Sequence, residues 1–202
     1  MKIIKYTKSG NNNYTILLDN NNKIKLNEDL ILKNNLLYKK EIDAYELSEL
    51  TKENKKYDIY NKCIKYISIR LRSINEMKEY LKKNDIDEIA SDKIINKLID
   101  NKLLNDELFT KAFINDKLKF STMGPYRIEQ ELKKHKIDNL IINKYINEID
   151  NNYLVEKINK QINKIIKSTK KNNNIRNKIY NNLLSLGYSN ELIVNNLNKY
   201  NF

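Results

Sequence analysis

Three stretches of this sequence share one pattern of apolar residues: MKEYLKKNDIDEIA at residues 77–90, IEQELKKHKIDNLI at 128–141 and IYNNLLSLGYSNEL at 179–192. Each stretch begins 51 residues after the previous one. Six apolar columns keep this spacing: Met77/Ile128/Ile179, Leu81/Leu132/Leu183, Ile86/Ile137/Tyr188, Ala90/Ile141/Leu192, Ile95/Ile146/Leu197 and Leu98/Ile149/Tyr200. A fixed period of this kind indicates tandem supersecondary units that bury their apolar faces on one another.

Helix-start signals repeat at the same interval. Asp87, Asp138 and Ser189 share one column just before an apolar-periodic stretch, and each can accept a hydrogen bond from a free N–H of a helix start. Each copy is therefore predicted to hold a first helix, a second helix of about ten residues, a tight turn and a third helix. The first helices are expected at residues 57–71, 106–119 and 153–168.

The second helix of each copy has its own predicted start. The segment 73–76 (Ser-Ile-Asn-Glu) has the form of a capping box, and Gly124-Pro125 places proline at the first helical position of the next copy. Asn174 is the nearest cap in the third copy. A short helix, tight turn and helix also resembles the DNA-binding helix-turn-helix, although compact three-helix units pack in this way for structural reasons alone.

The first part of the chain reads differently. Turn signals at residues 10–13 and 20–22 separate short β-type runs, and Asn27 is predicted to cap a short helix through Leu32. We expect a mainly α fold. It comprises a small unit with a β-hairpin and short helices at residues 1–55, followed by helical repeats at 56–105, 106–152 and 153–202 in an elongated, curved array.

The charge of the chain is strongly positive. Lys and Arg number 38 against 26 Asp and Glu, a net charge of +12, of which residues 51–202 carry +11. This excess favours nucleic acid, an anionic membrane surface or an acidic protein face as partner. The abundance of Asn, Lys and Ile fits a low-GC genome, so charge carries more weight than lysine identity. Without a secretory signal or a membrane-length apolar run, the expected location is the cytoplasm.

Catalytic and metal-binding groups are scarce. His135 is the only histidine and Cys63 the only cysteine, and three glycines cannot form a phosphate-binding loop. His135 is interpreted as a surface residue and Cys63 as a buried, inert thiol. Four tyrosines on amphipathic faces, Tyr66, Tyr80, Tyr126 and Tyr180, are interpreted as half-buried packing groups. We expect no catalytic site, metal or cofactor.

Four motifs together resemble the RecX family of regulatory proteins. Residues 66–73 (Tyr-Ile-Ser-Ile-Arg-Leu-Arg-Ser) are similar to the run that opens its first repeat, and residues 103–109 to its link into the second. Residues 124–132 (Gly-Pro-Tyr-Arg-Ile-Glu-Gln-Glu-Leu) and 183–188 match its Gly-Pro-x-Arg-Ile-x-x-Glu-Leu and Leu-x-x-x-Gly-Phe segments. The chain departs from the family at four positions: Asp85 and Lys136 stand where the family usually has a turn glycine, Asn105 stands for its first Asp, and Thr110 stands for its Ala.

The resemblance implies a function as well as a fold. Proteins of this family bind in the helical groove of the RecA–single-stranded-DNA filament, bridge neighbouring protomers and can block filament growth. Strand exchange, ATP hydrolysis and co-protease activity of RecA are lowered as a result. We therefore expect a non-catalytic, monomeric regulator whose partners are the RecA filament and single-stranded DNA, with double-stranded DNA left open and no membrane partner.

The basic residues of the repeats are the candidate RecA- and DNA-binding surface. For any single lysine a solvated surface position is the simpler interpretation, so the hypothesis depends on their collective field. For Arg70 a structural role in binding a carboxylate or helix end stays equally open. The candidates are Arg70, Arg72, Lys78, Lys82, Lys83, Arg127, Lys133, Lys134, Lys170, Lys171, Arg176 and Lys178.

Two other classes of function compete with RecA regulation. A helix-turn-helix DNA-binding protein acting without RecA would bind duplex DNA mainly through phosphates. A scaffold repeat protein for another partner would leave RecA ATP hydrolysis unaffected. An enzyme is a more distant alternative, which a nuclease assay with Mg²⁺ would expose.

Overall fold

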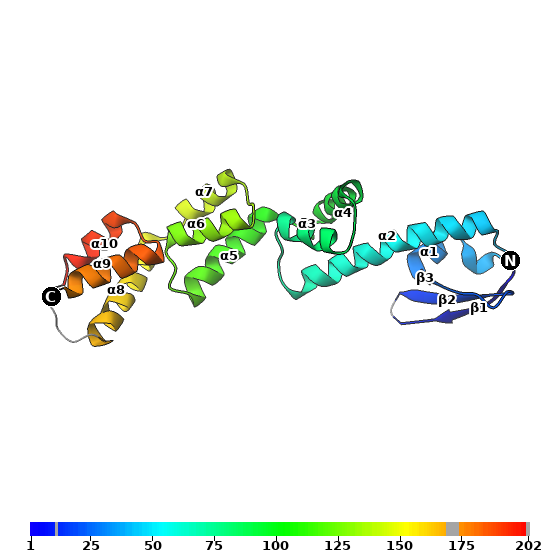
Figure 1. Cartoon of the computed structure of the whole chain (residues 1–202), viewed down its shortest axis with the longest axis horizontal. Helices are drawn as coiled ribbons and strands as arrows, with labels where there is room; N and C mark the ends of the chain where they lie inside the picture. Colours follow the sequence, from blue (N-terminus) through cyan, green and yellow to red (C-terminus); the bar gives the residue numbers. More distant parts are fainter. Residues whose placement is uncertain (11, 169–173, 201–202) are drawn as a thin grey trace. The chain divides into compact units, whose positions relative to one another are not determined.

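The computed structural model describes residues 1–10, 12–168 and 174–200 (Figure 1). Within these residues the chain forms a three-stranded sheet, one short 3₁₀-helix and ten α-helices. It divides into two compact units, Met1–Arg70 and Leu71–Phe202. The mainly helical fold with a small β-containing N-terminal part is as predicted.

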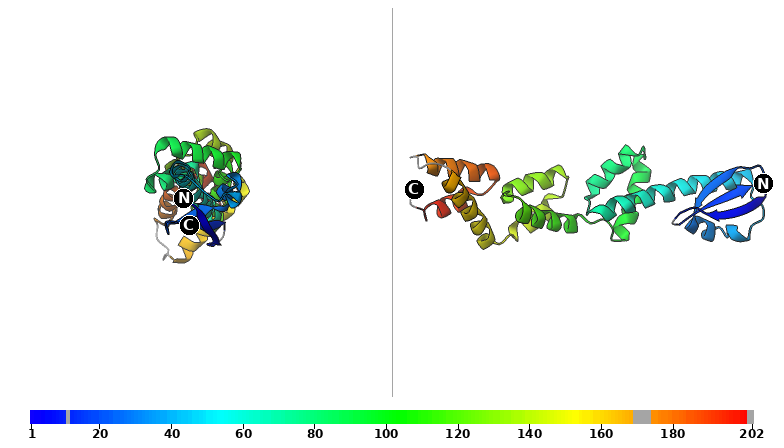
Figure 2. Two further views of the ribbon diagram at one scale, coloured as in Figure 1. Left: turned by 90° about the vertical axis from the view of Figure 1, so that its right-hand side faces the viewer. Right: turned by 90° about the horizontal axis from the view of Figure 1, so that it is seen from below.

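The first unit contains more sheet than the predicted hairpin. Strands β1 (Ile3–Lys8), β2 (Asn13–Leu18) and β3 (Lys23–Asn27) form one antiparallel sheet in the order β1-β2-β3 (Figure 2). Helix α1 (Glu28–Lys33), the 3₁₀-helix η1 (Leu36–Tyr38) and helix α2 (Ala44–Ile69) follow. Asn27 caps α1 as predicted, its side chain accepting a hydrogen bond from the Asp29 N–H at 3.0 Å.

A buried amide ties α2 to the sheet. The Asn54 side chain accepts from the backbone N–H of Asn27 at 2.8 Å and donates to the carbonyl of Lys25 at 3.2 Å. The apolar core beside it consists of Ile16, Leu18, Leu26, Leu30, Ile31, Leu36, Ile42 and Leu50. Since α2 runs on without a break, the predicted boundary at residue 55 falls inside a helix. The repeat boundaries themselves stay predictions.

Among the described residues of the second unit, all regular secondary structure is helical (Figure 1). Its helices are α3 (Ile74–Lys83), α4 (Glu88–Asp100), α5 (Asp106–Phe120), α6 (Pro125–Lys134), α7 (Asn139–Asn147), α8 (Asn151–Ser168), α9 (Ile175–Leu186) and α10 (Asn190–Leu197). Helices α5, α6 and α7 pack together, as do α8, α9 and α10. Two repeated columns are 0% exposed in all three copies: Met77/Ile128/Ile179 and Leu81/Leu132/Leu183. The period therefore marks the buried side of each second helix.

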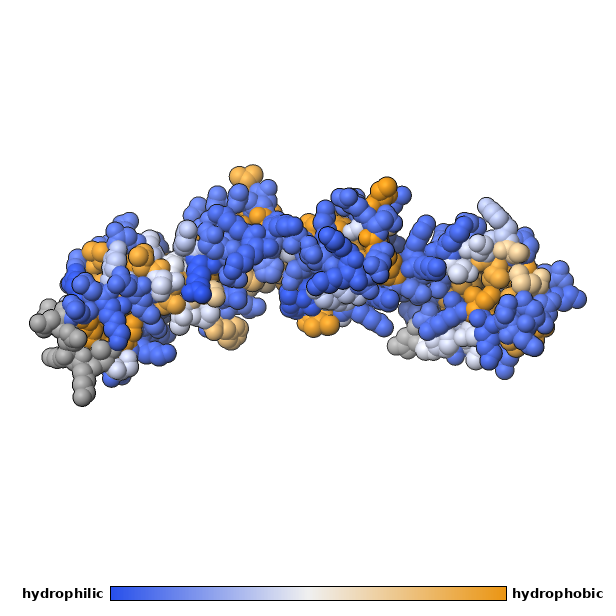
Figure 3. Space-filling model, in the orientation of Figure 1, coloured by the Kyte–Doolittle hydropathy of each residue, from blue (hydrophilic) through white to orange (hydrophobic). Residues whose placement is uncertain are grey.

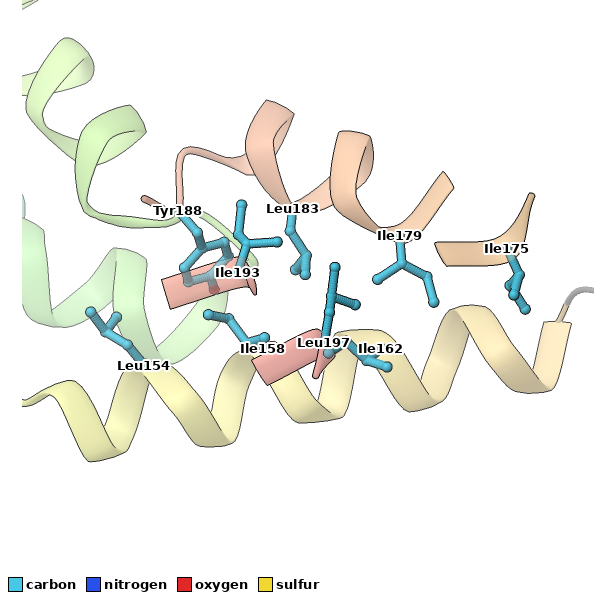
Figure 4. Packing of buried hydrophobic residues seen from close by; sticks show 9 residues of the cluster. All are labelled: Leu154, Ile158, Ile162, Ile175, Ile179, Leu183, Tyr188, Ile193 and Leu197. Atoms are coloured by element: carbon cyan, nitrogen blue, oxygen red, sulfur yellow. The ribbon is translucent and has the colours of Figure 1, made fainter. Parts of the chain in front are cut away.

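The second and third repeats share apolar contacts. Leu118 and Ile149 pack against both the core of α5–α7 and the core of α8–α10. Figure 4 shows the latter core, whose buried side chains come from all three helices and from the turn before α10: Leu154, Ile158, Ile162, Ile175, Ile179, Leu183, Tyr188, Ile193 and Leu197. The two repeats are thus joined by burial as well as by the chain.

The turn between second and third helices has one geometry in all three copies. Asp85, Lys136 and Gly187 lie in one column and adopt positive φ angles of 57°, 55° and 91°. In each copy the next backbone N–H returns to the carbonyl of the buried leucine five residues earlier, at 3.2, 3.4 and 3.3 Å. These bonds satisfy carbonyls that the helix end leaves free. The turn forms without glycine in two copies, although a side chain there costs energy.

The predicted caps of the third helices are confirmed. Asp87, Asp138 and Ser189 each accept a backbone N–H within the first turn, at 2.9, 2.7 and 3.3 Å. The Ser73 capping box and the proline at the first position of α6 are also present. The Asn174 side chain, in contrast, makes no capping hydrogen bond.

Candidate nucleic-acid interface

Exposed lysine pairs end two of the second helices. Lys82 and Lys83 occupy the last turn of α3, and Lys133 and Lys134 the last turn of α6. Cations at this end of a helix interact favourably with its dipole. Leu81 and Leu132, which precede the pairs, are buried, so each helix turns its opposite side to solvent.

Neighbouring carboxylates neutralise α6 more than α3. Lys133 pairs with Glu129 and Lys134 with Glu131, both at 2.6 Å, and the Lys134 hydrogen bond lowers the pKa of Glu131. Within the described part of the chain, neither Lys82 nor Lys83 forms an ion pair, although Glu79 lies one helical turn before Lys83 on α3. Exposed ion pairs are weak and can exchange partners. The α3 lysines can therefore bind an anion without first giving up an ion pair.

Lys78 extends the basic residues of α3 but already has a partner. Its ammonium lies 3.4 Å from the Asp92 carboxylate of α4, with both side chains more than half exposed. Lys178 is exposed on α9. Lys170 and Lys171 lie outside the described residues.

The arginines of the candidate surface also make contacts within the fold. The Arg72 side chain is only 10% exposed and lies 3.9 Å from Glu76, so little of it faces solvent, and its binding role stays a prediction. Arg127 is exposed and donates to the Ser185 carbonyl at 3.4 Å. Arg176 donates to the Asn198 side chain at 2.7 Å. Arg70 is exposed at the end of α2.

Two residues that the sequence analysis missed join successive repeats. The Asp106 carboxylate accepts from the Ile74 N–H at 2.8 Å, at the start of α3. Lys157, 51 residues later, donates to the carbonyl of Ser121 at 2.8 Å and to that of Leu118, at the end of α5. Each charge meets the helix end of opposite partial charge. Although the two residues are 51 positions apart, they carry opposite charges, so the repeat pattern gave no signal for these contacts.

Burial perturbs both of these charged groups. It raises the pKa of Asp106, while the hydrogen bond from Ile74 and the His135 charge act in the opposite direction. Burial, together with the nearby Lys160, lowers the pKa of Lys157. The energetic cost of burying each charge is thus offset in part by its helix-end contact.

A backbone joint also connects α6 with the turn before α10. The Gly124 N–H donates to Leu186 at 2.7 Å, and the Tyr126 N–H donates to Gly187 at 3.1 Å. A Cβ atom at Gly124 would lie 2.6 Å from the Gly187 carbonyl carbon. Only glycine permits this approach at residue 124, which explains why the Gly-Pro pair begins α6.

The remaining candidates for chemistry have packing roles. His135 is half-buried against Phe109 and Phe113, with ring centroids 5.2 and 5.3 Å away, so its interpretation as a surface residue was wrong. Cys63 is buried as expected, and burial raises the pKa of its thiol to about 11. Of the four tyrosines, Tyr126 is 64% exposed and the other three are half-buried.

The described residues lack two other kinds of feature. No group of three or more His, Cys, Asp or Glu side chains among them is arranged to hold a metal ion. None of the helices they form has both the length and the apolar character needed to cross a membrane.

Comparison with known proteins identifies the family. The family models described as the first and second three-helix domains of RecX match residues 60–98 and 105–146. A protein named Regulatory protein RecX from Listeria monocytogenes serotype 4a (strain HCC23) is 30% identical over 184 residues, covering 89% of this chain and 67% of that protein. The chain belongs to the RecX family. A RecX from Halalkalibacterium halodurans is 26% identical, covering 94% and 74% of the two chains.

Solved RecX structures share the fold. A crystal structure of RecX from Lactobacillus salivarius, 30% identical, covers 71% of this chain and 95% of its own with a TM-score of 0.67. A second crystal structure of regulatory protein RecX covers 95% and 96% with a TM-score of 0.76, at 20% identity. These relatives support a regulatory role for this RecX-family chain.

Proposed function

We propose that this chain binds RecA filaments on single-stranded DNA and restrains their recombinase, ATPase and co-protease activities. The observation that carries the proposal is the repetition of exposed lysine pairs on α3 and α6, within a chain of the RecX family. A repeated surface can contact several equivalent sites on a polymer at once.

Repetition also explains how individually weak contacts can be sufficient for filament binding. Once one repeat is bound, the next contact forms at high effective concentration, so individually weak interactions add up to stable binding. The positive charge of residues 51–202 adds attraction to DNA and to acidic protein surface. To change RecA activity, the protein must bind one filament state more tightly than the other. It acts as a monomer without chemistry of its own.

The direct test is RecA ATP hydrolysis on single-stranded DNA with increasing amounts of this protein. We expect saturable inhibition by the wild-type chain. Reversing Lys82, Lys83, Lys133 and Lys134 to Glu should weaken inhibition by at least about tenfold, since four favourable charge contacts become repulsive. Circular dichroism confirms that the variant folds.

A charge-matched control separates the effect of the α3 and α6 lysines from the effect of the net charge of the chain. Lys5, Lys8, Lys23 and Lys25 are exposed on the sheet of the first unit, and their reversal changes the total charge by the same amount. This control should inhibit nearly as well as wild type. Equal loss in both variants would show that the α3 and α6 lysines are not the binding surface, and no inhibition by wild type would refute the function.

DNA binding without RecA is the second candidate, favoured by the charge of +11 on residues 51–202. It predicts equal or tighter binding to bare DNA than to RecA-coated DNA at matched salt. RecA regulation predicts the reverse order of affinities.

A further inference from the structure

Two aliphatic side chains are exposed at equivalent positions of successive repeats. Ile89 is 72% exposed and Leu140 is 80% exposed, and they lie 51 residues apart. Each is the second residue of its helix, α4 or α7, directly after the Asp-capped start. Figure 3 shows hydrophobic side chains projecting from the polar surface over both helices.

The surroundings of these two residues repeat as well. An exposed lysine follows four residues later and an exposed asparagine seven residues later, a spacing that places all three on one helix face. We call each set a strip: Ile89, Lys93 and Asn96 on α4, and Leu140, Lys144 and Asn147 on α7. Lys144 lies 3.3 Å from Glu107, and both side chains are about half exposed. Because exposed ion pairs are weak, Lys144 can exchange Glu107 for another acidic partner.

Folding of α4 and α7 does not require these aliphatic residues. Asp87 and Asp138 cap the helices, and other apolar residues bury their inner faces, such as Leu98 in α4 and Ile142 in α7. A single exposed aliphatic residue is ordinary on a protein surface. Two in the same column, with the same neighbours, indicate a function that both repeats share.

The third repeat lacks the strip. Glu191 occupies the column of Ile89 and Leu140, and Asn195 replaces the lysine. Since α10 otherwise keeps its Ser189 cap and buried Leu197, the loss is confined to the exposed face. The chain therefore carries two copies of the strip and one position where the aliphatic residue is missing.

We propose that the strips on α4 and α7 bind two successive identical subunits of a protein filament, through an apolar depression edged by acidic groups. The repetition of the strip matches a partner that repeats, and its lysine matches acidic side chains. The exposed aliphatic residue that begins each strip finds no counterpart on a phosphate backbone, which argues for protein rather than DNA. The inference rests on the proposed function, in which the filament is RecA.

The test measures binding to RecA filaments on single-stranded DNA and to bare single-stranded DNA. Ile89→Asn and Leu140→Asn should each weaken filament binding by about tenfold, the usual effect of losing one buried aliphatic contact, and the double variant by more. Affinity for bare DNA should stay unchanged. Glu191→Leu should tighten filament binding by restoring the aliphatic residue of the third copy, and this expected gain keeps the test independent of any folding loss.

A matched control variant, together with outcomes that distinguish the strip inference from the proposed function, makes the result decisive. Ile4, 60% exposed on β1, provides the control Ile4→Asn, which should bind as wild type. If wild type binds filaments and all strip variants bind equally well, the strip inference fails while the proposed function stands. A parallel loss of bare-DNA affinity would show that the strips contact DNA. If wild type does not bind RecA filaments, both proposals fall.

Discussion

At the scale of single residues, the left-handed turn column shows how this chain holds a fold with an unfavourable side chain. Lys136 has a φ of 55°, which brings its Cβ close to the backbone carbonyl. The hydrogen bond from Ile137 to Leu132 and the burial of both residues keep it there. Gly187 occupies the same column without this cost.

Lys136→Gly should therefore stabilise the protein. We expect the free energy of unfolding to rise by about 1 kcal/mol, because the steric cost of the left-handed conformation exceeds the extra backbone entropy of glycine in the unfolded chain. Urea denaturation measures the change. Gln130→Gly, in the interior of α6, is the control and should destabilise the protein by about 1 kcal/mol; a loss of stability in Lys136→Gly would contradict the argument.

Asp106 gives a second residue-scale prediction. Asp106→Ala removes the acceptor for the Ile74 N–H and should cost about 1 kcal/mol of stability. Asp106→Asn keeps an oxygen that can accept this bond but cannot ionise, so it should be at least as stable as wild type near neutral pH.

The pH dependence of that comparison follows from the direction of the pKa. Burial raises the pKa of Asp106 in the folded chain above its unfolded value. Folding therefore binds a proton more strongly, and wild type loses stability as pH rises through the raised pKa. The advantage of Asp106→Asn should shrink below that pKa. Urea denaturation across pH measures it, and a constant difference would show that Asp106 titrates normally.

At the scale of helices, the sequence was most informative where local signals and the long period agreed. The caps at Asp87, Asp138 and Ser189 mark observed helix starts, because side-chain capping depends on only a few neighbouring residues. The buried columns were predictable because a helix that packs on one face needs an apolar residue every three or four positions.

Contacts between elements could not be predicted in this way. The sequence suggested an exposed Arg72, whereas the folded chain surrounds it and places it beside Glu76. The Asp106 and Lys157 contacts depend on which helix ends approach each other, and a single sequence does not encode this in its pattern. His135 is likewise half-buried because Phe109 and Phe113, from α5, pack against it.

The backbone joint between Gly124 and the turn before α10 connects the second and third repeats. A substitution at Gly124 tests whether this joint makes the two repeats act as one body. Gly124→Ala should destabilise the protein by about 1–3 kcal/mol, since the new methyl group meets the Gly187 backbone with no room to relax. The Tyr126 amide should lose hydrogen-exchange protection. Thr122→Ala, at a nearby exposed position, should change neither quantity. Unchanged exchange in Gly124→Ala would mean that the close approach is dispensable.

At the scale of the whole molecule, the net positive charge provides a long-range attraction that no single side chain provides. Residues 51–202 carry +11, yet several of their lysines already pair with carboxylates on their own or neighbouring helices. Such pairs leave the net charge unchanged while holding individual lysines in place. Long-range attraction to a nucleoprotein filament therefore depends on the sum, and contact depends on which lysines can exchange partners.

Salt should reveal this collective term. If about four lysines approach phosphates or acidic side chains, raising NaCl from about 50 to 200 mM should weaken filament binding by at least about tenfold, because bound counterions must be displaced. The variant with Lys82, Lys83, Lys133 and Lys134 reversed should show a flatter dependence, while the matched reversal on the sheet keeps the wild-type slope. Fluorescence anisotropy on RecA-coated single-stranded DNA measures all three. Equal slopes for all three proteins would place the electrostatic contact elsewhere on the chain, whereas the Ile89 and Leu140 substitutions should change the affinity and leave the slope intact.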